Sequence, residues 1–280
     1  MSPIHDQSYR RYAGTRLPVG RSWSVIAGHG IRAMLAKRAF LGLMIVAWIP
    51  FIVRSVQIWA LAYFPQAASV IAITPETFRD FLNQQGVWVF FTTIYVGSGL
   101  IAADRRANAL QIYLSKPLLR TEYVGGKLLV LASFLLGITL LPALLLILVQ
   151  MGFSGVTFIK NNFFVLPAVI LASMIQVIVA SFTMLALSSL SKSSRYVALL
   201  YTGAIFFTEA LFNALRVITG STRVSWVSIT GNLNQVIDVI FRLPARYETP
   251  IIVSVLVLVA LVVVSISVLE RRVKGVEVVS

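Results

Sequence analysis

Residues 104–127 read Asp-Arg-Arg-Ala-Asn-Ala-Leu-Gln-Ile-Tyr-Leu-Ser-Lys-Pro-Leu-Leu-Arg-Thr-Glu-Tyr-Val-Gly-Gly-Lys and separate two apolar runs, about 86–103 and 128–151. An α-helix needs about 20 apolar residues to cross a bilayer, and both runs are close to that length. The charged stretch between them is rich in helix-forming residues. We therefore expect two spanning helices joined by a structured loop that another protein can bind from the cytoplasm.

The composition extends this expectation to the whole chain. Of the 280 residues, 58% are hydrophobic and 12% are charged, and the mean hydropathy is +0.86. A soluble domain would have about a quarter of its residues charged. Long uninterrupted apolar runs favour a helical bundle over a β-barrel, because each helix satisfies its own backbone in lipid. The sequence predicts an all-α integral membrane protein.

Six apolar segments are long enough to span. We expect them at about 39–63, 86–103, 128–151, 164–190, 196–216 and 250–269. With both termini in the cytoplasm, seventeen of the 24 Lys and Arg residues flank the inner ends and six the outer ends. Pro50 and Pro142 lie inside the first and third segments and predict kinks.

Before the first span we expect an amphipathic elbow helix on the inner membrane surface. Its apolar residues recur at near-helical spacing, and they are Trp23, Ile26, Ile31, Met34 and Leu35. A basic flank without a fixed helix is the open alternative. Residues 1–20 are predicted to be a disordered cytoplasmic tail, and residues 21–280 a single transmembrane domain.

Two outer loops carry helix signals. Thr74 and Pro75 predict the N-cap and first residue of a short helix that leads into the second span. The loop at about 217–249 holds a segment with apolar residues at helical spacing that is too short to span, and these residues are Leu233, Val236, Ile237, Val239, Ile240 and Phe241. We expect a re-entrant or interfacial helix there, which Pro244 would end.

The net charge of +14 and the pI near 10.6 raise the question of nucleic acid. A nucleic-acid-binding surface gathers its basic residues on one soluble face, whereas these residues flank apolar runs. We interpret them as a topology signal that also attracts anionic lipid, so we expect lipid and no nucleic acid among the partners. The absence of cysteine excludes disulfides and thiolate chemistry.

Signals for catalysis are weak. Both histidines, His5 and His29, precede the first span, so no imidazole lies in the membrane to serve a serine nucleophile or a metal. We interpret Gly97-Ser98-Gly99 as small residues at a helix interface. The spans also lack an aspartate for an aspartyl dyad. We expect no catalytic residue, metal site or cofactor in this chain.

Gly125-Gly126-Lys127 has the ending of a phosphate-binding loop, but its context is wrong. Thr121 stands where the loop requires glycine, and Leu128 follows the lysine where Ser or Thr is required. The segment also opens a membrane helix instead of following a strand. We therefore expect no ATP site in this chain.

Two ionisable residues lie within predicted spans, where charge is costly. Arg54 and Glu209 both lie roughly 20 Å from the inner boundary, at 1.5 Å per helical residue. We hypothesise that they form an ion pair or line a pathway. For Arg54, extension toward the outer headgroups is an equal alternative. For Glu209, whose side chain is short, we favour a position facing the bundle or a cavity.

The loop after the second span has the pattern of an amphipathic helix from Ala107 to Lys116. Leu110, Tyr113 and Leu114 share one helical face, and Asp104, Arg105, Arg106 and Gln111 supply polar surface. The helix should end before Pro117. The second inner loop, residues 191–195, holds Lys192 and Arg195 and is long enough only for a tight connection.

A sequence pattern runs through residues 99–127. It comprises Gly99 to Arg106, Leu110, Leu114 to Leu118, Arg120 and Tyr123 to Lys127. In this pattern the chain resembles the ABC-2 family of ABC transporter permeases, in which an acidic residue follows the second span and Gly-Thr-Leu, Ser-x-Pro and Gly-Lys come after it. Asp104 stands here in place of the usual Glu, and Asn108-Ala109 in place of Gly-Thr.

The resemblance implies a permease half of an ATP-driven exporter in a bacterial-type plasma membrane. It would pair with a second copy or a paralogue and dock on two ABC ATPase subunits, which bind the ATP and Mg. The first inner loop would be the coupling helix. The implied docking residues are Asp104, Arg105, Arg106, Leu110, Tyr113, Leu114, Ser115 and Lys116, with Lys192 and Arg195 in the second inner loop.

In this family the first, second and fifth spans lie near the dimer axis, which would bring Arg54 and Glu209 close to the pathway. An alternative function of another class is a non-transporting membrane anchor or regulatory subunit that uses the same loop for docking. A secondary transporter is disfavoured, because Glu209 is the one acidic residue expected within a span. Lipid-linked glycans, drugs, peptides and ions all remain open as substrates.

Overall fold

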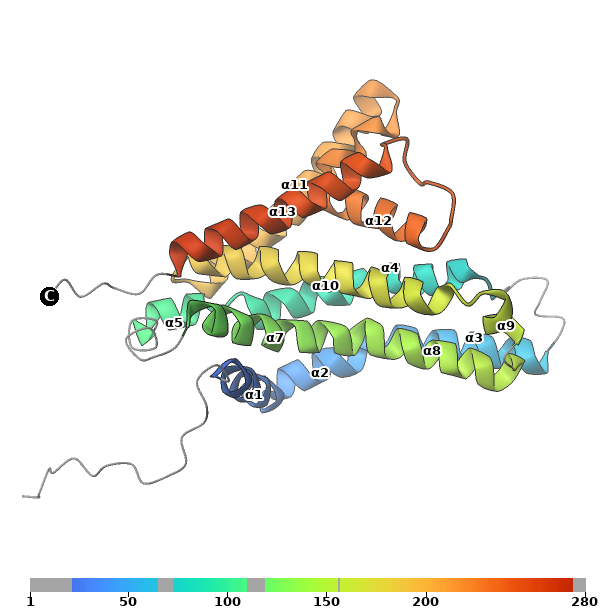
Figure 1. Cartoon of the computed structure of the whole chain (residues 1–280), viewed down its shortest axis with the longest axis horizontal. Helices are drawn as coiled ribbons and strands as arrows, with labels where there is room; N and C mark the ends of the chain where they lie inside the picture. The colour runs from blue at the N-terminus through green and yellow to red at the C-terminus, as the bar shows by residue number, and fades with distance from the viewer. Residues whose placement is uncertain (1–21, 65–72, 110–118, 156, 274–280) are drawn as a thin grey trace, which may run out of the picture.

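A computed structural model describes residues 22–64, 73–109, 119–155 and 157–273. Within these ranges the chain is helical and has no strand. Six of its helical segments are long and apolar enough to cross a membrane (Figure 1). The chain is therefore a multi-pass integral membrane protein.

The helices follow one another with short connections. Their bounds are α1 Ser22–Leu35, α2 Arg38–Ala47, α3 Ile49–Tyr63, α4 Pro75–Thr92, π-helix η2 Thr93–Gly97, α5 Ala102–Arg106, α7 Arg120–Ile138, α8 Leu140–Ser154, α9 Thr157–Asn161, α10 Val165–Leu190, α11 Ser194–Thr219, 3-10 helix η3 Thr222–Val227, α12 Ile229–Ile240 and α13 Ile251–Arg272. The six spans are Arg38–Tyr63, Pro75–Arg106, Arg120–Phe153, Val165–Leu190, Ser194–Thr219 and Ile251–Arg272.

The six predicted spans are confirmed, and the second differs most in length. It begins at Pro75 and reaches Arg106, over 32 residues, with a turn at residues 98–101 between η2 and α5. The backbone N–H of Thr74 donates to Thr77 Oγ1 at 3.2 Å in a capping box, which confirms the predicted N-cap. The predicted short outer helix is wrong as a separate element, because no break divides it from the span.

Both predicted kinks are present. α2 ends at Ala47 and α3 begins at Ile49, with Pro50 in its first turn. α7 ends at Ile138 and α8 begins at Leu140, two residues before Pro142. Each interruption lies within the turn that precedes the proline, where the ring excludes the regular helical hydrogen bond.

The fourth span, α10, lies at the centre of the bundle and contacts α4, α7, α8, α11, α12 and α13. Small buried residues such as Ala172 and Ala180 allow these close approaches. Figure 1 shows α11, α12 and α13 leaning away from the other helices. We call the end of the bundle that holds α5 the inner end, after the predicted orientation, and the end that holds α9 the outer end.

The predicted helix before the first span is α1. Figure 1 shows it nearly end-on beside α7, so it lies across the bundle. The two helices approach closely at two glycines. A Cβ atom on Gly126 would lie 2.8 Å from Ile26 Cβ, and a Cβ on Gly30 would lie 2.5 Å from Val130 Cγ2. Its position on the membrane surface stays a prediction.

Gly126→Leu should therefore detach α1, because the new side chain overlaps Ile26 and the backbone oxygen of Trp23. We expect a loss of roughly 1–3 kcal/mol in the free energy of unfolding in detergent. The matched control is Gly125→Leu, since a Cβ on Gly125 meets no atom within 4 Å. In a second measurement, a single cysteine at Ile26 should react faster with maleimide in the Gly126→Leu background. Equal behaviour of the two leucine variants would contradict this prediction.

Candidate functional site

The second span is interrupted near its inner end, and a serine of α10 closes the interruption. After η2, residues 98–101 form a turn before α5 begins. Ser188 Oγ accepts from the backbone N–H groups of Ile101 at 3.1 Å and Ala102 at 3.0 Å. The same hydroxyl donates to the carbonyl of Ser98 at 3.0 Å. One side chain thus satisfies three backbone groups that the break leaves free.

Gly97-Ser98-Gly99 lies within this interruption. A Cβ atom on Gly97 would lie 2.4 Å from Met184 Cγ, so no larger residue fits against α10 there. This close contact agrees with the interpretation of these residues as a helix interface.

Two of the predicted docking residues are bonded inside the chain. Asp104 Oδ2 accepts from the Tyr123 hydroxyl at 2.7 Å and lies 2.7 Å from Lys127 Nζ. Arg105 donates from Nη1 to the backbone oxygen of Ser189. These bonds tie the end of the second span to the third and fourth spans.

The other predicted docking residues divide into two groups. Arg106, Lys192 and Arg195 are exposed at the inner end, and residues 191–193 form the expected tight connection. The remaining five, Leu110, Tyr113, Leu114, Ser115 and Lys116, lie outside the described residues. Exposed positive charge at this end therefore comes from both inner loops.

The helix predicted from Ala107 to Lys116 differs at its start. α5 ends at Arg106, and Ala107 and Asn108 form a turn. Asn108 has a φ of 54°, the left-handed conformation that favours glycine and, among other residues, asparagine. This conformation turns the chain away from the axis of α5.

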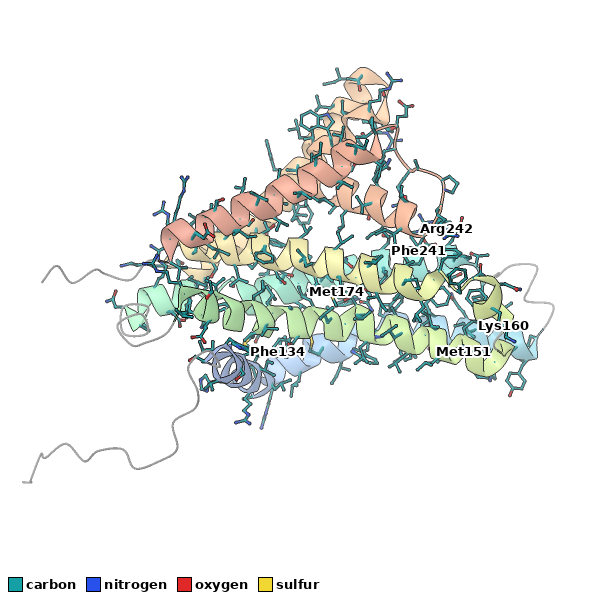
Figure 2. All side chains as sticks on the ribbon, viewed as in Figure 1. Phe134, Met151, Lys160, Met174, Phe241 and Arg242 are labelled. Atoms are coloured by element: carbon teal, nitrogen blue, oxygen red, sulfur yellow. The ribbon has the colours of Figure 1, made fainter. Side chains whose placement is uncertain are left out.

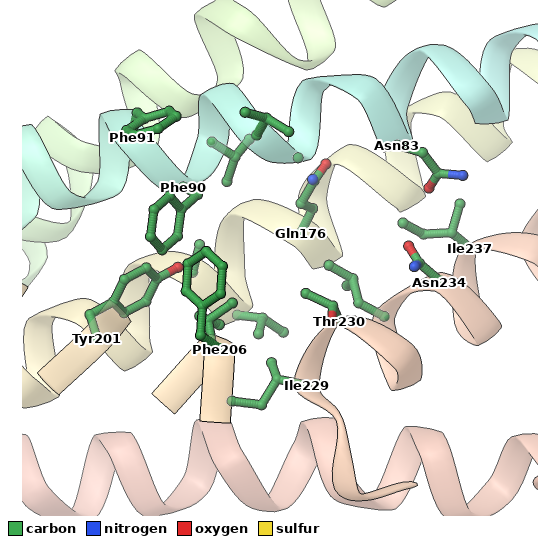
Figure 3. A pocket seen from close by; sticks show the side chains of 17 residues that line it. Asn83, Phe90, Phe91, Gln176, Tyr201, Phe206, Ile229, Thr230, Asn234 and Ile237 are labelled. Carbon is green, nitrogen blue, oxygen red and sulfur yellow. The ribbon is translucent and has the colours of Figure 1, made fainter. Parts of the chain in front are cut away.

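A cavity of about 410 Å³ lies between α4, α10, α11 and α12 (Figure 3). Most of the residues around it are apolar. The lining residues are Asn83, Gly86, Val87, Val89, Phe90, Phe91, Gln176, Val179, Ala180, Tyr201, Ile205, Phe206, Ile229, Thr230, Leu233, Asn234 and Ile237. This volume and lining are typical of a site for a small molecule.

Two side-chain amides of the cavity wall have unpaired oxygens. Gln176 Oε1 and Asn83 Oδ1 are buried without a hydrogen-bond partner, and Gln176 is only 5% exposed. Leaving a buried polar group unpaired costs about 1–3 kcal/mol. Figure 3 shows Gln176 directed into the cavity. The cavity therefore offers hydrogen-bonding groups that the protein itself does not use.

Glu209 lies beside the cavity and is held by hydroxyl groups. Its Oε2 accepts from Ser228 Oγ at 2.5 Å and from Thr230 Oγ1, a lining residue. Ser228 also caps α12 by accepting from the Gly231 N–H at 2.8 Å. The carboxylate thus lies at the N-terminus of α12, where the helix dipole favours negative charge.

Arg54 has a different partner. Its Nη1 donates to Gln57 Oε1 at 3.1 Å, one turn along the same helix. The ion pair that we hypothesised between Arg54 and Glu209 is not formed within the chain. α3 packs against α4 and α8, whereas α11 packs against α10, α12 and η3, so the two residues belong to different contacts.

A cluster of charges at the outer end joins α4 to α12 and was not predicted from the sequence. Asp238 is 1% exposed. Its Oδ1 lies 2.6 Å from Arg79 Nη1 and 3.1 Å from Arg246 Nη2, and its Oδ2 lies 3.1 Å from Arg246 Nε. The sequence offered one signal, an aspartate among the apolar residues Val236, Ile237, Val239 and Ile240.

Side chains and ring contacts close the loop that follows α12. Gln235 Nε2 donates to the backbone oxygens of Tyr247 at 3.1 Å and Thr249 at 3.0 Å. The Tyr247 ring packs edge-on against Phe212. Burial raises the pKa of the Tyr247 hydroxyl above its ordinary value, so this group stays neutral at physiological pH.

The guanidinium of Arg242, labelled in Figure 2, lies 4.6 Å from the ring centre of Phe164.

Among the described residues, no group of His, Cys, Asp and Glu side chains is arranged to hold a metal ion. Comparison with models of known protein families finds no match to the chain, and comparison with curated proteins finds none either.

Ser188→Ala should destabilise the protein, because it leaves the N–H groups of Ile101 and Ala102 unpaired in a buried site. We expect a loss of about 1–3 kcal/mol in the free energy of unfolding in detergent. Ser181→Ala is the control, since Ser181 Oγ is buried on the same helix without a partner. The prediction fails if the two alanine variants unfold at the same denaturant concentration.

Asp238→Asn should destabilise the protein more than Ser188→Ala, because Arg246 loses its buried counter-charge and Arg79 keeps Asp80, whose side chain is 48% exposed. We expect a loss of about 3 kcal/mol in unfolding free energy. The control is Glu248→Gln, whose partner Arg223 is 81% exposed and 3.6 Å away, for which we expect less than about 1 kcal/mol. Similar losses in the two variants would show that the buried cluster does not hold α4 to α12.

Proposed function

We propose that this chain is the permease subunit of an ATP-driven exporter of the ABC-2 type, which works with separate ABC ATPase subunits. The six spans and the pattern over residues 99–127 support this proposal. The observation that carries it is the arrangement of the inner end. Asp104 and Arg105 bond to neighbouring spans, while Arg106 of the same short helix is exposed.

This arrangement suits a docking surface that transmits motion from a bound partner to the neighbouring spans. A force on the exposed side of α5 would reach the third span through Lys127 and the fourth through Ser189. Asn108 supports the resemblance, because it stands where the family has glycine and has the backbone conformation that glycine favours.

The proposed mechanism uses the interruption of the second span. A π-helix frequently lies at a functional site, and η2 separates α4, which lines the cavity, from α5 at the proposed docking surface. Closure of the ATPases would displace α5 and shift α4 against α10 and α11. Access to the cavity would then alternate between the two sides of the membrane.

The rest of the proposal follows from the resemblance. The chain would lie in the plasma membrane of a bacterial-type cell with both termini in the cytoplasm, α1 on its inner surface and α12 as a re-entrant element. A second copy or a paralogue would complete the permease, and ATP and Mg would bind to the two ATPase subunits. The alternative function is a membrane anchor that uses the same inner end but carries no substrate.

Charge reversal at the exposed docking residues tests this proposal. Arg106→Glu combined with Arg195→Glu should reduce the amount of ATPase that co-purifies by about tenfold or more, because like charges across an interface are costly. Lys160→Glu is the control, since Lys160 is exposed at the outer end (Figure 2). The unsubstituted complex should hydrolyse ATP in lipid vesicles. A transport-active protein that is free of any ATPase would refute the proposal, and a stable complex without ATP hydrolysis would favour the anchor.

A further inference from the structure

The cavity between α4, α10, α11 and α12 has two chemically different ends. Figure 3 shows Asn83 and Asn234 at one end, Phe90, Tyr201 and Phe206 at the other, and Gln176 between them. Within the part of the chain that the structure describes, the lining contains no Lys, Arg, His, Asp or Glu. A ligand that matches this cavity has a polar end and an aromatic or aliphatic end, and it carries no net charge.

The unpaired amide oxygens define what the polar end must offer. The side chains of Gln176 and Asn83 make no hydrogen bond with the described residues, and the oxygen of each is buried. A carboxamide oxygen accepts hydrogen bonds, so hydroxyl or N–H groups on the ligand would satisfy both oxygens once the side chains rotate to turn them toward the cavity. Water alone would not explain the aromatic end of the same cavity, which has an apolar surface.

The surroundings of the cavity indicate the direction of access. Val87 and Phe91 of α4 and Phe206 of α11 line the cavity and are also exposed on the surface of the bundle. In a membrane this side would face hydrocarbon or a second permease copy. A ligand would therefore enter sideways from the membrane, which again favours an uncharged molecule.

We infer that this cavity binds an uncharged amphipathic molecule whose hydroxyl or N–H groups bond to Gln176 and Asn83 and whose aromatic or aliphatic body lies against Phe90, Tyr201 and Phe206. The volume of about 410 Å³ lies in the range for drug-sized ligands. Phosphorylated headgroups and carboxylates do not fit, because no cation lines the wall. The role of this molecule as transported cargo rests on the proposed function, whereas its binding does not.

Photolabelling of the full chain in lipid nanodiscs tests this inference with three matched probes. They are 4-(hydroxymethyl)benzophenone, which donates a hydrogen bond, 4-(methoxymethyl)benzophenone, which does not, and benzophenone-4-carboxylate, which is an anion. The measured quantities are the concentration for half-maximal labelling and the labelled peptides, identified by mass spectrometry. No ATPase is present, so the result does not depend on the proposed function.

We expect saturable labelling by the hydroxymethyl probe, with attachment to α4 and to the Tyr201 to Phe206 segment of α11. The methoxymethyl probe should need about a tenfold higher concentration, the effect of one lost hydrogen bond, and the carboxylate should not label above background. Gln176→Leu should reduce the difference between the first two probes, because one of the two acceptors is lost. Gly86→Leu, which fills the cavity beside Gln176, should abolish labelling by both.

The control is Gln84→Leu, since Gln84 lies on α4 next to Asn83 but is exposed and does not line the cavity. It should label like the unsubstituted chain. Unchanged melting temperatures would show that Gln176→Leu and Gly86→Leu remain folded. Equal labelling by the hydroxymethyl and methoxymethyl probes in the unsubstituted chain would overturn the inference and indicate a cavity filled by lipid chains. Preferential labelling by the carboxylate, or labelling spread over all spans, would overturn it as well.

Discussion

The hydrocarbon core of a membrane offers no hydrogen-bond partner to a backbone group, so another side chain must satisfy each break in a spanning helix. Ser188 meets this requirement for the second span by bonding to the N–H groups of Ile101 and Ala102 and to the carbonyl of Ser98. A hydroxyl has one donor and two acceptor sites, so the capacity of Ser188 is fully used. The position of α5, and of every charge on it, therefore depends on α10.

The same requirement governs the acidic side chains that lie within or beside the spans. Asp104 is held by Tyr123 and Lys127, and Asp238 is held by two arginines. Glu209 lies at the N-terminus of α12 with two hydroxyl groups. These bonds connect different helices, so the charges that make insertion costly also determine which helices lie side by side. The inner and outer ends are thereby fixed by separate polar clusters.

Hydropathy was sufficient to predict the six spans, because each contains a long apolar segment. It missed the first part of the second span, because Arg79, Asn83 and Gln85 make that part polar. Helix boundaries that depend on local chemistry, such as the cap at Thr74, were predictable from neighbouring residues. Interactions between distant parts of the chain were not predictable from the sequence. Asp238 and Arg79 are 159 positions apart, and no periodicity in the sequence pairs them.

The predicted pair of Arg54 and Glu209 shows that equal depth in the membrane does not determine which residues pair. Depth fixes the position of a residue along the membrane normal but leaves its rotation about the helix and its neighbours undetermined. The donors to Glu209 are the N-cap residue and a first-turn residue of α12, in a segment whose path hydropathy does not define. Similarly, the cavity depends on how four helices diverge, so its lining could not be read from any one of them.

Buried side-chain amides in this protein differ in how many of their polar atoms are bonded, and the difference bears on function. Gln85 and Asn232 each leave an oxygen unpaired, but their nitrogens donate to the backbone oxygens of Ala47 and Trp226. Gln176 and Asn83 lack even this bond within the described residues. A neutral amide tolerates such isolation at a modest cost, whereas a charge would not. Under the proposed function the cavity alternates between empty and occupied states, so it can keep unpaired amides in its wall, while the charges that hold the helices together stay paired.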